Sequence, residues 1–579
     1  MTTTTLLPEA AHRTAKLSSL SAVCLLILVL LSGALHLALW NARDDIAIFP
    51  DSIHQLSIAE NVLQHEGLST SVLHYPDHYL YGTVPVPQTV WPPGMGLGVA
   101  ALTSAGMSPL TALKTLTFVA DFLLPIAVFF GVAAFAGCAS AALLAGVVTL
   151  SLPSLWSYSL RLMSEPTFTL LTLLSLILLA WGVRRDHHPG LLLGAATLAA
   201  LSFLVRYAGL FYIAASGIVL LATALLNLNK RTIRGLVLYA AVSGLAVITL
   251  FSRNLLLRHQ VSGGQFSDTD PLGFPQAILR SYWLCKDLVR TWLGSWAPEW
   301  LLGAAVVAGI AVLGWMLVRT VYRFAREPDH RRDPVAILML TTGVYALVTA
   351  GVHLVSAALY AGWFLTEPRY FVVLFPLVVL ACGSYVAAGL RARATQTHRA
   401  GPWPAVTAGA LTAALLLAQV GLRWSDAIAE DHGHAQRHAR FAAALSMPMA
   451  SSLMENHDGT IGEYLRQRLN EHRAVLSQYP ESLYLALDRP SVGLVEGRFA
   501  RIAWTDDAVL ALLCRLPIDY VLVLRPAPGW HEDPNFFREL LSGAAPPWLH
   551  SVSRSGDVAL YAVDRGALGG QEGSPRCQI

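Results

Sequence analysis

Long apolar runs make up most of the chain. From Leu17 to Leu422, runs of about 20 mostly apolar residues recur, each long enough to cross a hydrocarbon core of about 30 Å. The runs are continuous and do not alternate with polar residues, so they predict α-helices and not the strands of a membrane barrel. We expect about eleven membrane-spanning helices, at residues 17–40, 110–133, 139–156, 166–183, 190–206, 208–228, 235–253, 299–319, 335–359, 369–390 and 404–422.

Basic residues gather in five places along the chain. These are residues 13–16, 182–188, 229–234, 318–332 and 391–399. Because cytoplasmic loops collect Lys and Arg, we place all five inside, with the N-terminus inside and the C-terminus outside. The apolar segment 91–107 then does not cross, since a crossing would invert every later loop. We expect an interfacial or re-entrant helix there, begun by Pro92-Pro93, where a missing N–H costs nothing.

Two long loops are thereby assigned to the outer face. In the first, residues 41–108, the sequence PDS at 50–52 predicts a helix start and Gly67 its end. Apolar residues recur at helical spacing between these points, so we expect this helix to lie flat in the headgroup layer. The second loop, residues 255–298, is first rich in turn residues and then in aromatics, which suit a membrane interface.

After Leu422 charges and prolines return, and no further span follows. Three runs have the composition of strands: 481–488, 518–525 and 557–564. Residues 506–516 have a helical pattern, and about 155 residues suffice for one small domain. We therefore expect an all-α polytopic membrane module with juxtamembrane helices at 1–422 and a small extracytoplasmic α/β domain at 423–579.

The composition agrees with a membrane protein. Of the 579 residues, 54% are hydrophobic and 13% are charged, whereas soluble domains contain roughly 25% charged residues. The net charge of +3 is too small to indicate a nucleic-acid partner. The six cysteines are scattered and form no CxxC pair, and Cys285, Cys514 and Cys577 are too few and too far apart to indicate a disulfide framework.

Ionisable residues from four distant segments meet at the outer ends of the predicted spans. They are Asp51, Arg161, Glu165, Arg206, Glu367 and Arg369. Each has an ordinary explanation, because carboxylates favour helix starts and arginines can snorkel to lipid headgroups. Their gathering on one face of the membrane is what indicates a functional site.

This set of side chains suits one kind of chemistry. A carboxylate near water can act as a general base, and arginines bind phosphate bidentately and stabilise it as a leaving group. A lipid-linked phosphate presents its headgroup at this depth. The set predicts glycosyl transfer from a polyprenyl-phosphate sugar, at the outer face, to an acceptor hydroxyl or amine.

Two other classes of protein stay open. Asp121 lies within the second predicted span, where an ionisable group is costly. A polar contact between helices is its ordinary explanation. An ion path would instead favour a multi-pass transporter of a lipid-linked or small anionic substrate. A membrane scaffold whose outer domain binds a partner is the third class.

Several segments resemble the C-type (GT-C) integral membrane glycosyltransferases. "PDSIHQLSIAENVLQHEGLS" followed by "VWPPGMGLGVAAL" resembles their first outer loop, particularly in the dolichyl-phosphate-mannose-protein mannosyltransferase and aminoarabinose transferase branch. "SEP", "VRYAGL" and "EPRYFVVLFPLVV" resemble later landmarks of bacterial members. The resemblance covers about residues 17–390. It implies a polyprenyl-phosphate donor, inverting transfer at the outer face, and a catalytic Asp in the first loop. We expect the protein in the bacterial cytoplasmic membrane, with the acceptor open among glycan, lipid and protein of the cell envelope.

The resemblance maps the catalytic acid to Asp51 and a second acidic position to Glu165. The neighbouring Asp44 and Asp45 stay an alternative for the active pair. A lysine common in the family is absent before the Pro-Pro motif, so the phosphate contact must come from elsewhere. We assign substrate binding to Arg161, Arg206, Arg369, His54, Tyr207, Glu367 and Tyr370.

No cofactor is assigned, but a divalent cation stays an alternative. Some members of the family use one, and Asp51 with Glu165 could hold it. The histidines of segments 74–78 and 432–438 could also bind zinc. Neither segment supplies a full ligand set, and solvated surface is their ordinary explanation.

Overall fold

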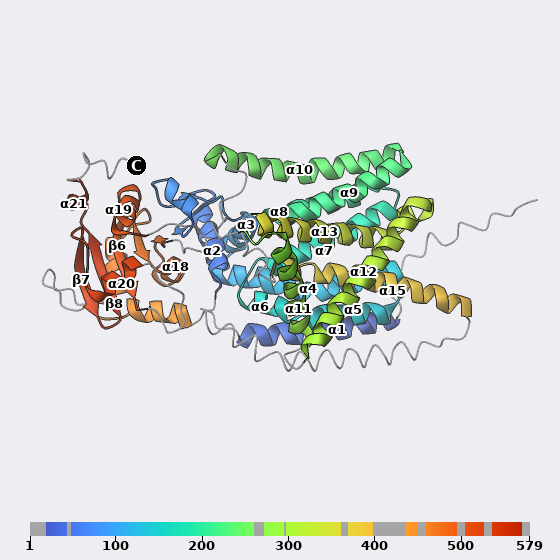
Figure 1. Ribbon diagram of the computed structural model, residues 1–579, viewed down its shortest axis with the longest axis horizontal. Helices are drawn as coiled ribbons and strands as arrows, with labels where there is room; N and C mark the ends of the chain where they lie inside the picture. Colours follow the sequence, from blue (N-terminus) through green and yellow to red (C-terminus); the bar gives the residue numbers. More distant parts are fainter. Residues whose placement is uncertain are drawn as a thin grey trace, which may run out of the picture.

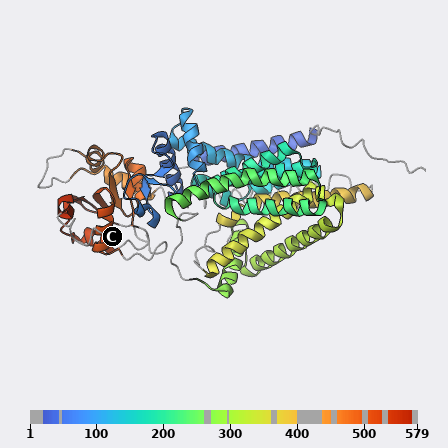
Figure 2. The ribbon, with the colours of Figure 1, turned by 90° about the horizontal axis from the view of Figure 1, so that it is seen from above.

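The computed structural model describes residues 19–42, 48–259, 271–293, 297–359, 369–397, 436–449, 459–494, 504–525 and 535–569. A bundle of helices forms one part of the molecule, and a sheet with short helices packs at one end of it (Figure 1). Seen from above, the segment between helices α1 and α4, which we call the first loop, lies between these two parts (Figure 2).

The bundle confirms a multi-pass helical membrane protein. Its helices are α1 (Ser19–Ala42), α4 (Pro109–Ala136), α5 (Ala139–Leu150), α6 (Pro153–Leu160), α7 (Glu165–Arg184), α8 (Pro189–Val205), α9 (Gly209–Asn227), α10 (Lys230–Arg258), α11 (Phe274–Leu293), α12 (Glu299–Arg326), α13 (Pro334–Leu359), α14 (Arg369–Val372) and α15 (Phe375–Thr397), with the 3₁₀ turn η3 (Pro328–Arg332) before α13. Eight of the described helices are long and apolar enough to cross a membrane, or nine if the pair α5 and α6, bent by 50°, counts as one span. The predicted span 190–206 forms the shorter α8, of 17 residues. The predicted span 404–422 lies outside the described residues.

Helix α3 (Gly94–Ser104) corresponds to the segment expected not to cross. Its 11 residues extend only about 16 Å, too little to cross a bilayer alone. Glycine is required for its packing. A Cβ at Gly94 would lie 2.6 Å from the backbone of Leu204, and one at Gly96 would lie 2.7 Å from the side chain of Ile58. The glycines thus let α3 pack closely against α8 and α2.

Helix α2 (Pro50–Leu63) begins where the sequence predicts, but it is not an amphipathic helix with one covered face. Residues 52–59 are all buried, and they include polar as well as apolar side chains. The core around α2 contains residues of α3, α4 and α18 (Pro480–Leu487). The expectation that α2 lies flat in the headgroup layer considered the first loop alone, whereas the C-terminal part covers its remaining faces.

A mixed six-stranded sheet joins the C-terminal part to the first loop. Its strand order is β2-β5-β4-β6-β8-β7, with bounds β2 (Val72–Leu73), β5 (Ser491–Val492), β4 (Ala474–Ser477), β6 (Ile518–Leu524), β8 (Val558–Val563) and β7 (Leu549–Ser555). Strand β2 belongs to the first loop and pairs in parallel with β5, Val72 opposite Ser491. A two-stranded sheet of β1 (Ser69–Thr70) and β3 (Val86–Pro87) and the 3₁₀ turn η2 (Pro76–Leu80) complete the loop.

The C-terminal helices are α17 (Ile461–Arg468), α18, α19 (Asp506–Arg515), α20 (Asn535–Ser542) and α21 (Arg565–Gly569), and residues 436–445 are also helical. The strands expected at 518–525 and 557–564 are confirmed as β6 and β8, and the helix at 506–516 as α19. The strand expected at 481–488 is wrong, because this segment forms α18. Pro480 occupies the first turn of α18, and the buried Leu483, Tyr484 and Leu487 recur at helical spacing.

The second long loop contains a helix that the sequence analysis did not identify. Helix α11 has 20 residues and covers the aromatic half of the segment 255–298. Ala277, Leu284 and Leu288 are buried along it, whereas Ile278 and Trp283 are exposed. The segment is therefore an amphipathic helix and not only an aromatic-rich connection.

Asp121 makes the polar contact between helices that is its ordinary explanation. Its carboxylate lies 3.1 Å from Nε2 of His36 in α1 and accepts a hydrogen bond of 2.7 Å from the hydroxyl of Ser159 in α6. A buried carboxylate with such partners is stable as part of the packing. Asp121 was the residue that favoured an ion path, so this contact removes the main support for the transporter alternative.

Candidate active site

Four of the residues predicted to form the site make two ion pairs that are largely shielded from solvent. Nη1 of Arg369 lies 2.6 Å from Oδ2 of Asp51, and Nη1 of Arg206 lies 2.8 Å from Oε1 of Glu165. The side chains are 12% and 17% exposed in the first pair and 12% and 0% exposed in the second. Each pair therefore joins two segments that are distant in sequence.

The first turn of α2 sets the position of Asp51. The N–H of Phe49 donates to the carbonyl of Arg161 (3.2 Å), and the hydroxyl of Ser52 donates to the same carbonyl (3.1 Å). The guanidinium carbons of Arg161 and Arg369 each lie 5.9 Å from the centre of the Phe49 ring. A carboxylate in the first helical turn is favoured by the helix dipole. The docking of α2 thus brings Asp51, Arg161 and Arg369 around Phe49.

The second pair ties the start of α7 to the turn between α8 and α9. Glu165 opens α7, directly after Ser164, and Arg206 ends α8 in an extended conformation. Nη1 of Arg206 also donates to the hydroxyl of Ser164 at 3.0 Å. A fully buried carboxylate needs a charged partner to offset its desolvation. Arg206 is that partner, and the pair orders this end of the bundle.

The two predicted tyrosines have different surroundings. The hydroxyl of Tyr207 donates to the carbonyl of Thr89 (3.0 Å) and accepts from the amide of Asn254 (3.1 Å). Burial raises the pKa of Tyr207 to about 12, so this side chain is a neutral link from α10 to the first loop. Tyr370 lies beneath the guanidinium of Arg369, at 5.3 Å, and packs edge-on against His353 at 4.9 Å.

His54 belongs to a buried cluster that the sequence analysis did not foresee. It is 0% exposed, one turn along α2 from Asp51, and its Nε2 lies 3.7 Å from Oε1 of Glu481 in α18. Nδ1 of His74 lies 2.7 Å from the same oxygen. Burial raises the pKa of the Glu481 carboxyl, but the imidazoles of His74 and His54 outweigh burial and hold this pKa well below its usual range. The C-terminal part thus supplies a buried charge next to the helix that carries Asp51.

The described histidines of the two histidine-rich segments are buried or partly buried at the junction with the C-terminal part and are not solvated surface. Asp77 is ion-paired with Arg258. Burial, together with His54 and His74, lowers the pKa of His78 well below its usual range. His438 is hydrogen-bonded through its ring nitrogens to Ser482 (2.9 Å) and to the carbonyl of Ile48 (2.8 Å). His432 and His434 lie outside the described residues, as do Glu367, Asp44 and Asp45.

The described residues do not fit the cation alternatives. Among them, no group of three or more His, Cys, Asp or Glu side chains could hold a metal ion. Asp51 and Glu165 each face an arginine instead of each other's carboxylate. We therefore route no chemical step through a metal.

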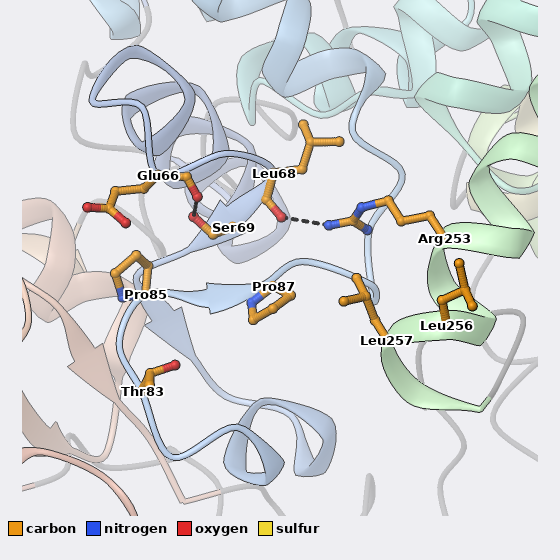
Figure 3. A pocket seen from close by; sticks show the side chains of 9 residues that line it. All are labelled: Glu66, Leu68, Ser69, Thr83, Pro85, Pro87, Arg253, Leu256 and Leu257. Carbon is orange, nitrogen blue, oxygen red and sulfur yellow. Dashed lines mark hydrogen bonds between the residues drawn. The ribbon is translucent and has the colours of Figure 1, made fainter.

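A cavity of about 580 Å³ opens between the first loop and the last turns of α10. Figure 3 shows Arg253 reaching from α10 to the loop, where its guanidinium donates to the carbonyls of Leu68 and Gln88, both at 2.8 Å. Leu256, which also lines the cavity, is 82% exposed. Both the loop and the bundle contribute polar and apolar residues to the lining of the cavity.

Three solved structures resemble this chain over most of its length. The aminoarabinose transferase ArnT from Cupriavidus metallidurans in the apo state has 14% sequence identity and a TM-score of 0.54, covering 93% of this chain and 98% of that one. The same enzyme bound to undecaprenyl phosphate has 15% identity and a TM-score of 0.45, covering 92% and 97%. The archaeal oligosaccharyltransferase AglB from Archaeoglobus fulgidus, in complex with an inhibitory peptide and a dolichol-phosphate, has 12% identity and a TM-score of 0.48, covering 87% and 69%.

These comparisons concern the fold. No protein-family model and no curated protein sequence matches the chain. The likeness to the apo transferase extends over nearly both whole chains. The resemblance to C-type glycosyltransferases that the sequence indicates is therefore confirmed for the fold of the chain.

Proposed function

We propose that this chain is an inverting glycosyltransferase that moves a sugar from a polyprenyl-phosphate donor to a hydroxyl or amine acceptor at the membrane surface. The observation that carries the proposal is the partly buried Asp51–Arg369 pair, 2.6 Å apart, at the membrane-surface end of a C-type glycosyltransferase fold. The aminoarabinose transferase of this fold has been solved with undecaprenyl phosphate, and this supports the same class of lipid here.

The chemistry follows from the two kinds of charged group. Asp51 accepts the proton of the acceptor, and the acceptor oxygen or nitrogen attacks the anomeric carbon of the sugar. The bond from this carbon to the phosphate oxygen breaks, and the electron pair leaves with the lipid phosphate. Arg369 stabilises the phosphate charge that develops. A guanidinium has five N–H donors, so it can contact a phosphate and a carboxylate together.

The other predicted residues have supporting roles in this proposal. Arg161, like Arg369, lies next to the Phe49 ring and adds positive charge near the pair. Glu165 keeps the guanidinium of Arg206 at a fixed position, which reduces the reorganisation that phosphate binding would need. His54 lies on the same helix as Asp51, and Tyr370 packs against the guanidinium of Arg369.

Location and domain roles belong to the same proposal. We assign the protein to a bacterial cytoplasmic membrane, and the distribution of basic loops supports an orientation with the N-terminus inside and the site at the outer face. Residues 1–422 would form the transferase module, and residues 423–579 the outer domain. The acceptor would be a glycan, a lipid or a protein of the cell envelope.

The test uses the full chain in proteoliposomes with a panel of polyprenyl-phosphate sugars. Release of polyprenyl phosphate and labelling of an envelope extract measure transfer. Asp51→Asn is expected to lower the rate roughly 10²–10⁴-fold, because positioned proton transfer contributes about that much. Asp329→Asn, a change at an exposed carboxylate, is the matched control.

Two outcomes would contradict the proposal. A fully active Asp51→Asn variant would remove Asp51 from the role of base. Movement of the intact lipid-linked or free substrate across the liposome membrane, without transfer of the sugar, would identify a transporter instead.

A further inference from the structure

The end of the bundle away from the C-terminal part carries a polar pocket that the proposed transfer reaction does not use. The last turns of α10 bind the first loop through Arg253 and Arg258. Helix α10 has 29 residues, a length of about 43 Å, so its first turn lies at the opposite end of the bundle. There it meets the turn between α7 and α8, and together they line a cavity of about 280 Å³.

The lining of this pocket carries excess positive charge. Arg185, Arg231 and Arg234 line it together with a single carboxylate, Asp186. That carboxylate is already shared, because it is ion-paired with Arg231 and lies 3.1 Å from Nη2 of Arg332. In the described part of the chain, neither Arg185 nor Arg234 has a carboxylate within ion-pair distance. The pocket therefore suits an anion.

A buried histidine in the lining lacks hydrogen-bond partners. His187 is 4% exposed, and neither of its ring nitrogens has a partner among the described residues. A Cβ on Gly235 would lie 3.4 Å from Nδ1 of His187, so the ring packs against the backbone of α10. Burial lowers the pKa of His187, which leaves a neutral imidazole with one N–H to donate. A buried donor without an acceptor is costly, and a bound anion would supply the acceptor.

Two helices begin beside the pocket. Pro189, which lines it, is the first residue of α8, and Lys230 is the first residue of α10. The N-terminal end of a helix has a partial positive charge and favours anions. This contribution has the same sign as that of the arginines.

Apolar residues next to the pocket indicate where the rest of the ligand would lie. Leu193 of α8 is 44% exposed, and Ile233 and Val237 of α10 are 46% and 59% exposed. Both helices are apolar, and α10 is long enough to cross a membrane. A ligand with its phosphate in the pocket would therefore lay acyl chains along these side chains, whereas a free anion would leave them uncovered.

We propose that this pocket binds the phosphate group of an anionic phospholipid. Basic pockets at the ends of membrane helices recognise such headgroups. The proposal rests on residues at the opposite end of the bundle from Asp51 and does not depend on the proposed transfer reaction. Its failure and the failure of that reaction are therefore separate results.

The experiment measures lipid retention by native mass spectrometry on the full chain in detergent. The probes are dioctanoyl phosphatidylglycerol, dioctanoyl phosphatidylcholine and inorganic phosphate. The test variant is Arg185→Gln/Arg234→Gln. The control variant, Arg184→Gln/Arg319→Gln, removes the same charge from exposed arginines at this end of the bundle that do not line the pocket.

We expect phosphatidylglycerol to bind in preference to phosphatidylcholine, and the test variant to weaken this binding roughly 30-fold, since each basic residue near an anionic lipid contributes about fivefold. The control variant should change it less than threefold. Equal weakening by both variants would overturn the pocket in favour of diffuse attraction. Equal binding of inorganic phosphate and phosphatidylglycerol would overturn the lipid in favour of a free anion.

Discussion

The two ends of the bundle differ in how their charged side chains are paired and how far they are exposed. At the end that meets the C-terminal part, acids and arginines form matched pairs, and no side chain of the Asp51–Arg369 or Glu165–Arg206 pair is more than 17% exposed. At the other end arginines outnumber acids and face water. Arg231 there is 75% exposed and Arg332 is 52% exposed.

The difference teaches what each end can do. A buried charge must be compensated, so breaking a buried pair is costly, whereas an exposed pair contributes little. Matched buried pairs hold their guanidinium groups in fixed positions, which suits a reaction that develops charge on a phosphate. Excess exposed arginines suit attraction to a membrane surface. The predictions below test this contrast, beginning with the largest effect.

The contrast predicts its largest effect at Glu165. Replacing Glu165 by Ala leaves Arg206 buried without its partner, and breaking a buried pair destabilises a protein by about 3–5 kcal/mol. Thermal unfolding in detergent measures the change. The double variant Glu165→Ala/Arg206→Ala should recover much of the loss, because no unpaired charge then remains. A loss below about 1 kcal/mol in the single variant would mean that this pair behaves like a surface pair.

A smaller effect is expected at Arg369, on activity. Arg369→Gln removes a charged donor from the site, and loss of one such donor lowers a rate by about 10²–10³-fold. Arg369→Lys keeps the charge but not the planar donor geometry, so it should retain part of the rate. Initial rates of sugar transfer at saturating acceptor give both values. If Arg369→Gln transfers sugar at the parental rate, Arg369 does not contact the phosphate.

Much of the bundle is predictable because membrane spans have a strong sequence signal. An apolar run of about 20 residues has few alternatives to a helix. Shorter elements lack that signal. Residues 481–488 contain an apolar run that suits a strand or a helix by periodicity alone. Pro480, at the first turn of α18, was the available indication of a helix.

For the candidate site, the sequence predicts which charged residues share one side of the membrane, but it does not predict which of them pair. Span ends and basic loops indicate that Asp51, Glu165, Arg206 and Arg369 share one side. Which acid meets which arginine depends on how the helices approach, and Arg369 is 318 positions from Asp51. Glu481 is 407 positions from His74 and lies in the C-terminal part, where the described residues include no membrane span. Only the three-dimensional fold brings it to the first loop.

A third prediction concerns a carboxylate that lies at the end of the bundle next to the C-terminal part and has no described arginine as its partner. Glu60 of α2 is hydrogen-bonded to the hydroxyl of Tyr484, and no described basic group lies within ion-pair distance. Burial raises the pKa of Glu60 from 4.5 to about 7. Between these values the folded protein keeps a proton that the unfolded chain has lost, so stability falls as pH rises through this window.

The expected size is modest, because Glu60 is only partly buried. From pH 5 to pH 8 the parent should lose about 1–2 kcal/mol more stability than the Glu60→Gln variant loses. This value is already reduced for solvent screening. Thermal unfolding of both proteins between pH 5 and 8 measures the difference. Identical pH profiles for the two proteins would show that Glu60 stays charged throughout this pH range. A carboxylate at this end of the bundle would then not need an arginine partner to stay charged.

The smallest effect is predicted at the exposed end. Asp186 is 31% exposed and is paired with Arg231 and Arg332, so Asp186→Asn should change stability by about 0–1 kcal/mol. Asn is chosen because it tolerates the positive φ of this position, 55°. The same change removes the only carboxylate among the described residues that line the pocket. Binding of phosphatidylglycerol should therefore become several-fold tighter. Thermal unfolding and native mass spectrometry of one preparation measure both quantities. A loss of about 3 kcal/mol, the size expected for a buried pair, would show that the two ends do not differ in how they hold charge.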